Sequence, residues 1–222
     1  EELRRFIGAN EVPDNCGEAW LLSCVDGKTS VIANGYYKDY RFDDLIEEKG
    51  EQLLGREIYK KYKSFPLLIK LIDAADKLSV QVHPDDEIAR LRHGSYGKNE
   101  MWYIINSDND SWLVLGFNEI ITKDDYIRFV NNGELTDKMN KVKISNDDVY
   151  YIPAGLVHAI GNNILLAEIQ QSSDITYRIF DWNRRGDDGK LRELHTEQAI
   201  DAIKYFEPID CKIDYDKRVK NK

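Results

Sequence analysis

Short runs rich in aromatic and β-branched residues, each bounded by Gly, Asn, Asp or Pro, recur along most of this 222-residue chain. Such runs are typical of short strands that lie on a packed sheet. Because few helical patterns separate them, they favour a mainly β protein, either a sandwich or a barrel. The eleven predicted strands cover residues 19–25, 30–33, 67–73, 78–83, 101–106, 112–117, 141–145, 149–152, 159–161, 164–170 and 176–180.

The chain is long enough to form one domain around a core of its own. We place this domain at residues 1–209, with helical inserts around 43–62, 122–135 and 196–206. Residues 210–222 form a charged tail, which we interpret as a fraying end or as the start of a further C-terminal region.

Start and stop signals support the helical inserts. Gly50 and Gly55 break the first helix, and Thr122 can cap the second, with Asp125 in the capping-box position. A short helix is also predicted after Pro84. One side of the third insert is apolar, which predicts a helix packed on a sheet. That side consists of Ala199, Ile200, Ala202, Ile203 and Phe206.

The charge balance excludes two classes of partner. The chain has 31 Lys and Arg against 40 Asp and Glu, a net charge of −9, so it repels nucleic acid and anionic membranes. No apolar stretch is long enough to span a bilayer, and the first residues do not resemble a secretory signal. The spacing of the three cysteines fits neither a zinc knuckle nor a disulfide framework. We therefore expect a soluble cytoplasmic protein with reduced thiols; the sequence carries no signal for an oligomeric state.

Three polar side chains share one face of the strand predicted at residues 78–83. Strict alternation places Ser79, Gln81 and His83 on this face and apolar residues on the other. The face either points to bulk solvent or lines a site. The segment alone does not decide between these two interpretations.

A second segment places an imidazole directly after a rigid turn. Pro153 fixes its own φ, and Gly155 can adopt a φ that other residues avoid, so the turn holds His158 in a defined position. Because apolar residues flank His158, a hydrogen-bonded core histidine is the alternative to a metal ligand. The other two histidines, His93 and His195, lie in polar surroundings, and we expect them at the surface.

A carboxylate directly precedes the strand predicted at residues 101–106. Glu100 precedes an apolar run, and a carboxylate is costly to bury there unless a cation or a strong donor meets it. Two imidazoles, a carboxylate and an amide oxygen suit Zn²⁺, Fe²⁺, Co²⁺ or Mn²⁺, with a coordination position left for water or substrate. An open position indicates catalysis rather than a structural metal site.

These residues carry a resemblance to known proteins. Pro153, Gly155, His158 and Asn162 match the second motif of the cupin superfamily. Further segments, in the same order along the chain, resemble the type I mannose-6-phosphate isomerases in their short bacterial form. The segments are 17–20, 81–85, 98–102, 170–178, 181–184 and 194–199. The resemblance implies a cupin-type β-sandwich or jelly roll with helical inserts.

The resemblance also implies a metal site and a reaction. It implies that Gln81, His83, Glu100 and His158 bind one divalent metal, commonly zinc in this family. The implied reaction interconverts mannose 6-phosphate and fructose 6-phosphate through an enediol or enediolate, with a hexose 6-phosphate as the partner. The alternation argument had already placed Gln81 and His83 on one face.

Two basic residues match the family's functional positions. Arg178 would stabilise the enediolate or anchor the substrate. The proton carrier would be Lys98, if burial and the metal lower its pKa, or a water molecule on the metal. Ser79 is a candidate contact with the substrate. Local sequence alone also allows Arg178 to pair with Asp181, Lys98 to be a solvated loop charge, and Ser79 to be a residue without a special role.

Two other functions remain open. Two histidines and a carboxylate are also the ligand set of iron oxygenases, although Gln81 and Arg178 would then lack an obvious purpose. A non-enzymatic cupin that binds a sugar phosphate is the second alternative. It is favoured because the sequence lacks the family's tryptophan-glycine-glycine stretch before residue 3 and its β-rich region after residues 196–206.

Overall fold

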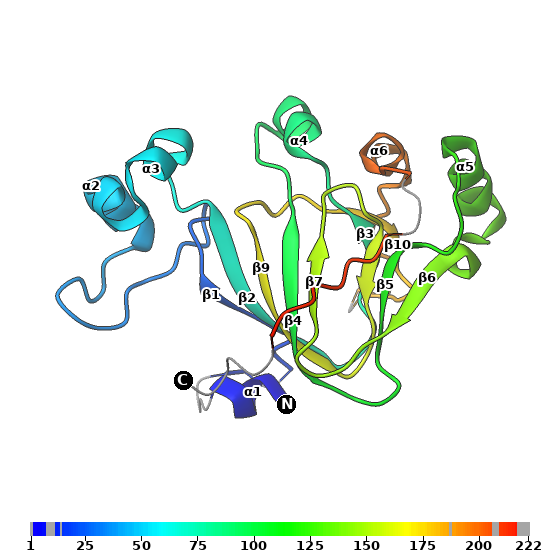
Figure 1. The fold of residues 1–222 in the computed structure, drawn as a ribbon, viewed down its shortest axis with the longest axis horizontal. Helices are drawn as coiled ribbons and strands as arrows, with labels where there is room; N and C mark the ends of the chain where they lie inside the picture. The colour runs from blue at the N-terminus through cyan, green and yellow to red at the C-terminus, as the bar shows by residue number, and fades with distance from the viewer. Residues whose placement is uncertain (1, 8–11, 14, 187, 206–208, 217–222) are drawn as a thin grey trace.

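Two antiparallel sheets of five strands each occupy the centre of the part of the chain that the structure describes (Figure 1). The structure is a computed structural model and describes residues 2–7, 12–13, 15–186, 188–205 and 209–216. In chain order the strands are β1 (Glu18–Leu22), β2 (Leu67–Ala74), β3 (Val80–Val82), β4 (Glu100–Ser107), β5 (Trp112–Phe117), β6 (Met139–Lys143), β7 (Val149–Ile152), β8 (His158–Ile160), β9 (Ile164–Gln171) and β10 (Tyr177–Phe180).

The strand order brings together segments that are far apart in the sequence. One sheet has the order β1-β2-β9-β4-β7 and the other has the order β10-β3-β8-β5-β6. The longest pairing joins β2 to β9, from Leu67 opposite Gln171 to Ala74 opposite Ile164. Consecutive strands such as β2 and β3 lie in different sheets, so the two sheets form a sandwich. The predicted mainly β sandwich with helical inserts is confirmed.

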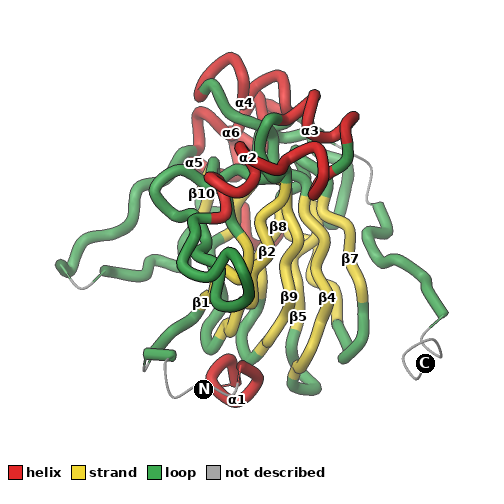
Figure 2. The backbone as a smooth tube through the Cα atoms, turned by 90° about the vertical axis from the view of Figure 1, so that its left-hand side faces the viewer, coloured by secondary structure: helices red, strands yellow, loops and turns green. Residues whose placement is uncertain are grey.

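Helices gather at one end of the sandwich. Figures 1 and 2 show α2 to α6 there, while α1 lies at the opposite end near the N-terminus. None of the helices in the described part of the chain is long and apolar enough to cross a membrane. The helices are α1 (Glu2–Ile7), α2 (Phe42–Leu54), α3 (Arg56–Tyr62), α4 (Asp86–His93), α5 (Lys123–Asn132) and α6 (Thr196–Ala202), with a 3₁₀ helix at Leu135–Lys138.

The predicted helix signals act where they were expected. Thr122 and Asp125 form a reciprocal capping box at the start of α5. Lys49 has non-helical dihedral angles within α2, and Gly55, with φ of 80°, separates α2 from α3. The third insert is shorter than predicted, because α6 ends at Ala202. Phe206, which we assigned to its apolar side, lies outside the described residues.

Ten of the eleven predicted strands exist, and the strand predicted at residues 30–33 is wrong. Val31 forms only an isolated bridge with Arg41, and 59% of its surface is exposed. The run has β-forming residues but no sheet face to pack on, so it stays in a loop. The strand predicted at residues 78–83 is limited to Val80–Val82.

The apolar residues form two main clusters on the two sides of the β10-β3-β8-β5-β6 sheet. One cluster lies between the sheets and includes Trp102, Ile104, Leu113, Ile152 and Leu166. The other lies under α5 and α6 and includes Val80, Val82, Val114, Phe129 and Ala199. Because β3 sends its valines toward the helices, its alternate residues face the interior of the sandwich.

The predicted fraying end differs from the structure in its described part. Ile213 donates its backbone N–H to Val149 of β7 at 2.8 Å, and Tyr151 of β7 donates to Cys211 at 2.8 Å. The side chain of Lys212 pairs with the buried Asp148 at 2.8 Å. This segment therefore covers the edge of β7. Residues 217–222 of the predicted tail lie outside the described residues.

Candidate metal centre

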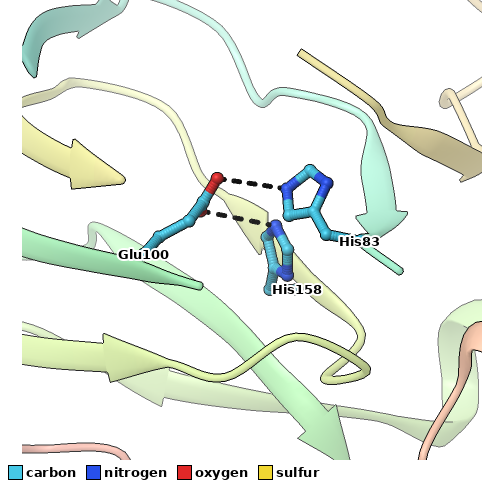
Figure 3. A group of neighbouring side chains, drawn as sticks. All are labelled: His83, Glu100 and His158. Atoms are coloured by element: carbon cyan, nitrogen blue, oxygen red, sulfur yellow. Dashed lines mark ion pairs between the residues drawn. The ribbon is translucent and has the colours of Figure 1, made fainter. Parts of the chain in front are cut away.

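Three of the four predicted metal ligands form one buried cluster. His83 follows β3, Glu100 begins β4 and His158 begins β8, and their ligand atoms all lie within 4.8 Å of one another (Figure 3). β3 and β8 belong to one sheet, whereas β4 belongs to the other. The cluster therefore bridges the two layers of the sandwich.

Backbone carbonyls orient both imidazoles. His83 Nδ1 lies 3.0 Å from the carbonyl oxygen of Ile175, and His158 Nδ1 lies 2.8 Å from that of Leu156. A neutral imidazole that donates from Nδ1 keeps its lone pair on Nε2. Both Nε2 atoms face Glu100. The Nε2 of His83 lies 3.1 Å from Oε1 of Glu100, and the Nε2 of His158 lies 3.8 Å from its Oε2. This arrangement, in which a backbone group fixes the ring and its tautomer, is common at metal sites.

The protonation states match those of metal ligands. Burial, with the nearby Lys98 charge, lowers the pKa of His83 to about 3, and burial also lowers the pKa of His158. Burial by itself raises the pKa of Glu100, but the positive charge of Lys98 outweighs it and holds this pKa well below its ordinary value. The cluster thus contains two neutral imidazoles and one carboxylate, the forms that bind a divalent metal.

Gln81 approaches the same cluster. It pairs with His158 across β3 and β8, and its Nε2 lies 3.3 Å from His158 Nε2. A half-turn of the amide would present its oxygen, the atom that binds metals, to the same place. The structure thus brings all four predicted ligands together, and Gln81 and His83 share a side of their strand as alternation predicted.

The turn before His158 has the backbone conformation that its glycine predicted. Gly155 has a φ of 91°, which other residues rarely adopt. Its N–H donates to the carbonyl of His83 at 2.9 Å, and its own carbonyl accepts from Lys204 at 3.0 Å. The turn therefore connects His83 and His158 to the residues that follow α6.

A pocket of about 660 Å³ adjoins the cluster, within the range of small-molecule sites. Gln81 and Lys98 connect the pocket to the cluster, since each lines the pocket and contacts a residue of the cluster. Ser79 and Arg178 also line the pocket, so every predicted site residue is in the cluster or beside it. The remaining polar lining consists of Glu18, Lys70, Glu168, Asp174, Thr176, Arg184, Arg185 and Arg192.

Lys98 is a buried cation rather than a solvated loop charge. Its Nζ lies 3.1 Å from Glu100 Oε1. Burial lowers the pKa of Lys98, but the carboxylates of Glu100 and Glu168 outweigh burial, so the pKa lies above its ordinary value. This direction favours a charged Lys98 that donates to Glu100.

Arg178 is held by the segment that precedes α6. Its Nη1 donates to the carbonyl of Glu193 at 2.9 Å, and its backbone exchanges hydrogen bonds with His195 at 2.7 and 3.2 Å. Asp181, the alternative partner, instead pairs with Arg184 and Arg192. The ring of His195 thus accepts a bond that positions Arg178, a role that its polar surroundings did not reveal.

Sequence reasoning missed an ion network on β9 and β2. Glu168 is buried, with Oε1 at 3.3 Å from Lys70 Nζ and Oε2 at 3.0 Å from Trp102 Nε1. Lys70 also pairs with Glu18 at 3.2 Å. Burial, followed by the charge of Glu100, raises the pKa of Glu168 to about 7. The signal was available, because Glu168 is a carboxylate within an apolar strand, as Glu100 is.

Comparison with known proteins gives a consistent result. Residues 2–110 match the family described as phosphomannose isomerase type I, catalytic domain. The chain is 38% identical to mannose-6-phosphate isomerase of Streptococcus mutans, over 94% of this chain and 65% of that protein. It is 40% identical to mannose-6-phosphate isomerase ManA of Bacillus subtilis, over 84% of this chain and 58% of that protein.

A solved structure is similar over nearly the same region. The crystal structure of the mannose 6-phosphate isomerase from Bacillus subtilis superposes with a TM-score of 0.84 and 35% identity. The match covers 91% of this chain and 63% of that one. The chain therefore spans less than two thirds of the length of these relatives.

Proposed function

The chain belongs to the type I mannose-6-phosphate isomerases. From this family membership we propose that it interconverts mannose 6-phosphate and fructose 6-phosphate. The proposed site is the pocket beside His83, Glu100 and His158. The proposed reaction moves one proton between C2 and C1 through an enediol or enediolate. It requires one divalent metal, which we propose is zinc.

One observation carries the metal requirement. His83 Nε2 is fully buried and has no hydrogen-bond donor among the residues that the structure describes. It lies 3.1 Å from a carboxylate oxygen, which is also an acceptor. Two buried acceptors at this distance repel one another unless a cation lies between them. Imidazole, carboxylate and amide ligands fit zinc with a position left open.

The metal, when bound, would stabilise negative charge that develops on the sugar oxygens. Lys98 and Arg178 keep their charge in the pocket, so they would hold the substrate and donate to those oxygens. Ser79 would supply a further polar contact. Glu168 lines the same pocket, and its pKa of about 7 suits a group that accepts and returns a proton near neutral pH.

A coupled assay on metal-stripped protein tests the proposal. Zn²⁺, Co²⁺, Mn²⁺ and Fe²⁺ are restored singly, and turnover of both hexose phosphates is measured. We expect metal-dependent turnover that His158→Ala lowers by roughly 100-fold or more, because even an outer partner of a metal ligand is worth about 10- to 100-fold. The metal content of His158→Ala after dialysis should fall together with its turnover.

His93→Ala is the matched control. This imidazole is exposed and bonds to the hydroxyl of Tyr177 at 2.8 Å, away from the pocket lining. The His93→Ala variant should leave turnover and metal content unchanged.

Absence of metal-dependent turnover with either hexose phosphate contradicts the proposed isomerase activity. Tight sugar-phosphate binding without proton exchange at C2 would identify a binding protein, and oxygen consumption with Fe²⁺ would identify an oxygenase.

A further inference from the structure

Arginine side chains gather on one part of the pocket lining. Arg178, Arg184, Arg185 and Arg192 all line the pocket, although the chain carries a net charge of −9. Arg178 forms no ion pair with any described residue, and Arg192 has 44% of its side chain exposed. An acidic protein that concentrates guanidinium groups at one place in a small-molecule pocket is suited to a strongly anionic ligand group.

A single buried carboxylate holds two of these arginines. Asp181 is only 5% exposed. It accepts from Arg192 Nε at 2.7 Å and Nη2 at 2.5 Å, and from Arg184 Nη2 at 2.5 Å. Arg184 Nη1 also donates to the carbonyl of Lys77 at 2.8 Å. These bonds fix both guanidinium planes against the fold before any ligand arrives.

The group has an excess of positive charge and unused donors. Among the described residues, the carboxylate of Asp181 pairs with two of these guanidinium groups, and burial, followed by the charge of Arg192, lowers the pKa of Arg178. The Nε atoms of Arg178 and Arg184 are buried without an acceptor among the described residues. Arg192 directs one edge at Asp181, and its Nη1 has no acceptor among the described residues, so its donors can bind another oxygen. A phosphate dianion supplies both the charge and the oxygens.

We propose that Asp181 is a positioning residue that holds Arg184 and Arg192 as a clamp for the phosphate group of the substrate. The inference rests on the proposed function, which makes the substrate a hexose 6-phosphate. The same pocket contacts the metal cluster through Gln81 and Lys98, so the clamp would direct the other end of the sugar toward the metal. Asp181 therefore governs KM for the phosphorylated sugar more than kcat.

Steady-state kinetics of Arg192→Gln, Arg192→Lys and Asp181→Asn test the clamp. We expect Arg192→Gln and Asp181→Asn to raise KM for mannose 6-phosphate by about 10- to 100-fold, the value of a charge-assisted hydrogen bond, with kcat changed by less than about threefold. Arg192→Lys, which keeps the charge, recovers part of the loss. Because an asparagine amide opposes guanidinium donors with its own N–H groups, Asp181→Asn releases both arginines.

Asp201→Asn is the matched control. Asp201 also binds two cations, Arg92 at 2.6 Å and Lys123 at 3.1 Å, but it is exposed and outside the pocket. It should leave KM and kcat unchanged. Unchanged KM in Arg192→Gln, or a loss confined to kcat, overturns the clamp. If Asp181→Asn fails to fold, the half-exposed Arg192 variants decide alone.

Titration with inorganic phosphate separates the clamp from the proposed reaction. We expect phosphate to bind the wild-type protein at least about tenfold more tightly than Arg192→Gln. If the wild-type protein shows no isomerase activity but this difference persists, the proposed function fails and the clamp stands. Equal phosphate affinity in the two proteins overturns the clamp, whether or not the enzyme is active.

Discussion

Glu100 keeps its negative charge where solvent is excluded, because the ammonium group of Lys98 lies 3.1 Å from its Oε1. Removing one member of such a buried group leaves a charge without compensation, which costs more than the pair contributes. The residue types at these positions are therefore constrained together. A metal would add a further positive charge to a carboxylate that already has one cation.

Glu168 should make the stability of the metal-free protein depend on pH. Its folded-state pKa of about 7 lies above the ordinary value of 4.5, because the site is buried and Glu100 is near. Between these values the folded state holds a proton that the unfolded state has lost. The free energy of unfolding should therefore fall from about pH 4.5 to about pH 7 by roughly 3 kcal/mol at most, and this contribution should be constant above pH 7.

Glu168→Gln removes this titration. Denaturant unfolding of the wild-type and variant proteins from pH 5 to pH 8 should show a difference in stability that moves steadily in favour of the variant as pH rises. Glu47→Gln, at an exposed position on α2, should run parallel to the wild type at every pH. Parallel curves for Glu168→Gln as well would mean that Glu168 titrates as an exposed glutamate.

At the scale of elements, the turn between β7 and β8 determines where His158 lies. Gly155 has φ of 91°, and a Cβ there would lie 2.7 Å from Lys204 Cγ and 3.1 Å from the carbonyl oxygen of Ala202. Gly155→Ala should therefore lower stability by roughly 2 kcal/mol or more, since the left-handed conformation alone costs a side chain about 1–2 kcal/mol. Metal affinity should fall too, because Gly155 N–H bonds the carbonyl of His83.

Gly35→Ala isolates the backbone part of this cost. Gly35 has φ of 79°, and a Cβ there would meet nothing within 4 Å. Thermal unfolding and metal titration are measured for both variants. Gly35→Ala reports the cost of backbone strain alone, and Gly155→Ala reports the cost of backbone strain together with steric crowding. If both variants lose the same stability and both keep full metal affinity, the turn does not position His158 in the way we describe.

At the scale of the whole molecule, the metal cluster links the two sheets. His83 directly follows β3 and His158 begins β8 of one sheet, whereas Glu100 begins β4 of the other, so an ion bound by all three opposes separation of the layers. Zinc at 100 times its Kd should stabilise the protein by about 2.7 kcal/mol. For a chain of this size the melting temperature should then rise by roughly 5–10 °C.

Differential scanning calorimetry with and without zinc measures this shift. His158→Ala should abolish it, and Mg²⁺, which prefers an all-oxygen shell, should not reproduce it. An equal shift in His158→Ala would place the stabilising zinc elsewhere.

Local patterns were sufficient for most of the elements and for part of the site. Alternation identified the shared side of Gln81 and His83, and the Pro153–Gly155 turn was recognised from residue types, because both depend on neighbouring residues alone. The false strand at residues 30–33 has the same origin, since local propensity ignores whether a sheet is present to pack against.

What the sequence determined by itself is therefore most of the strands, the polar face that Gln81 and His83 share, and the residue types that suit a metal. Only the tertiary structure decided that β3 lies between β10 and β8, that β4 faces them from the other sheet, and that Asp181 meets Arg192. The physical reason is the separation along the chain over which each kind of interaction acts. Backbone and side-chain preferences act over a few residues, whereas Glu168 meets Lys70, and Glu100 meets His158, only because distant segments come together.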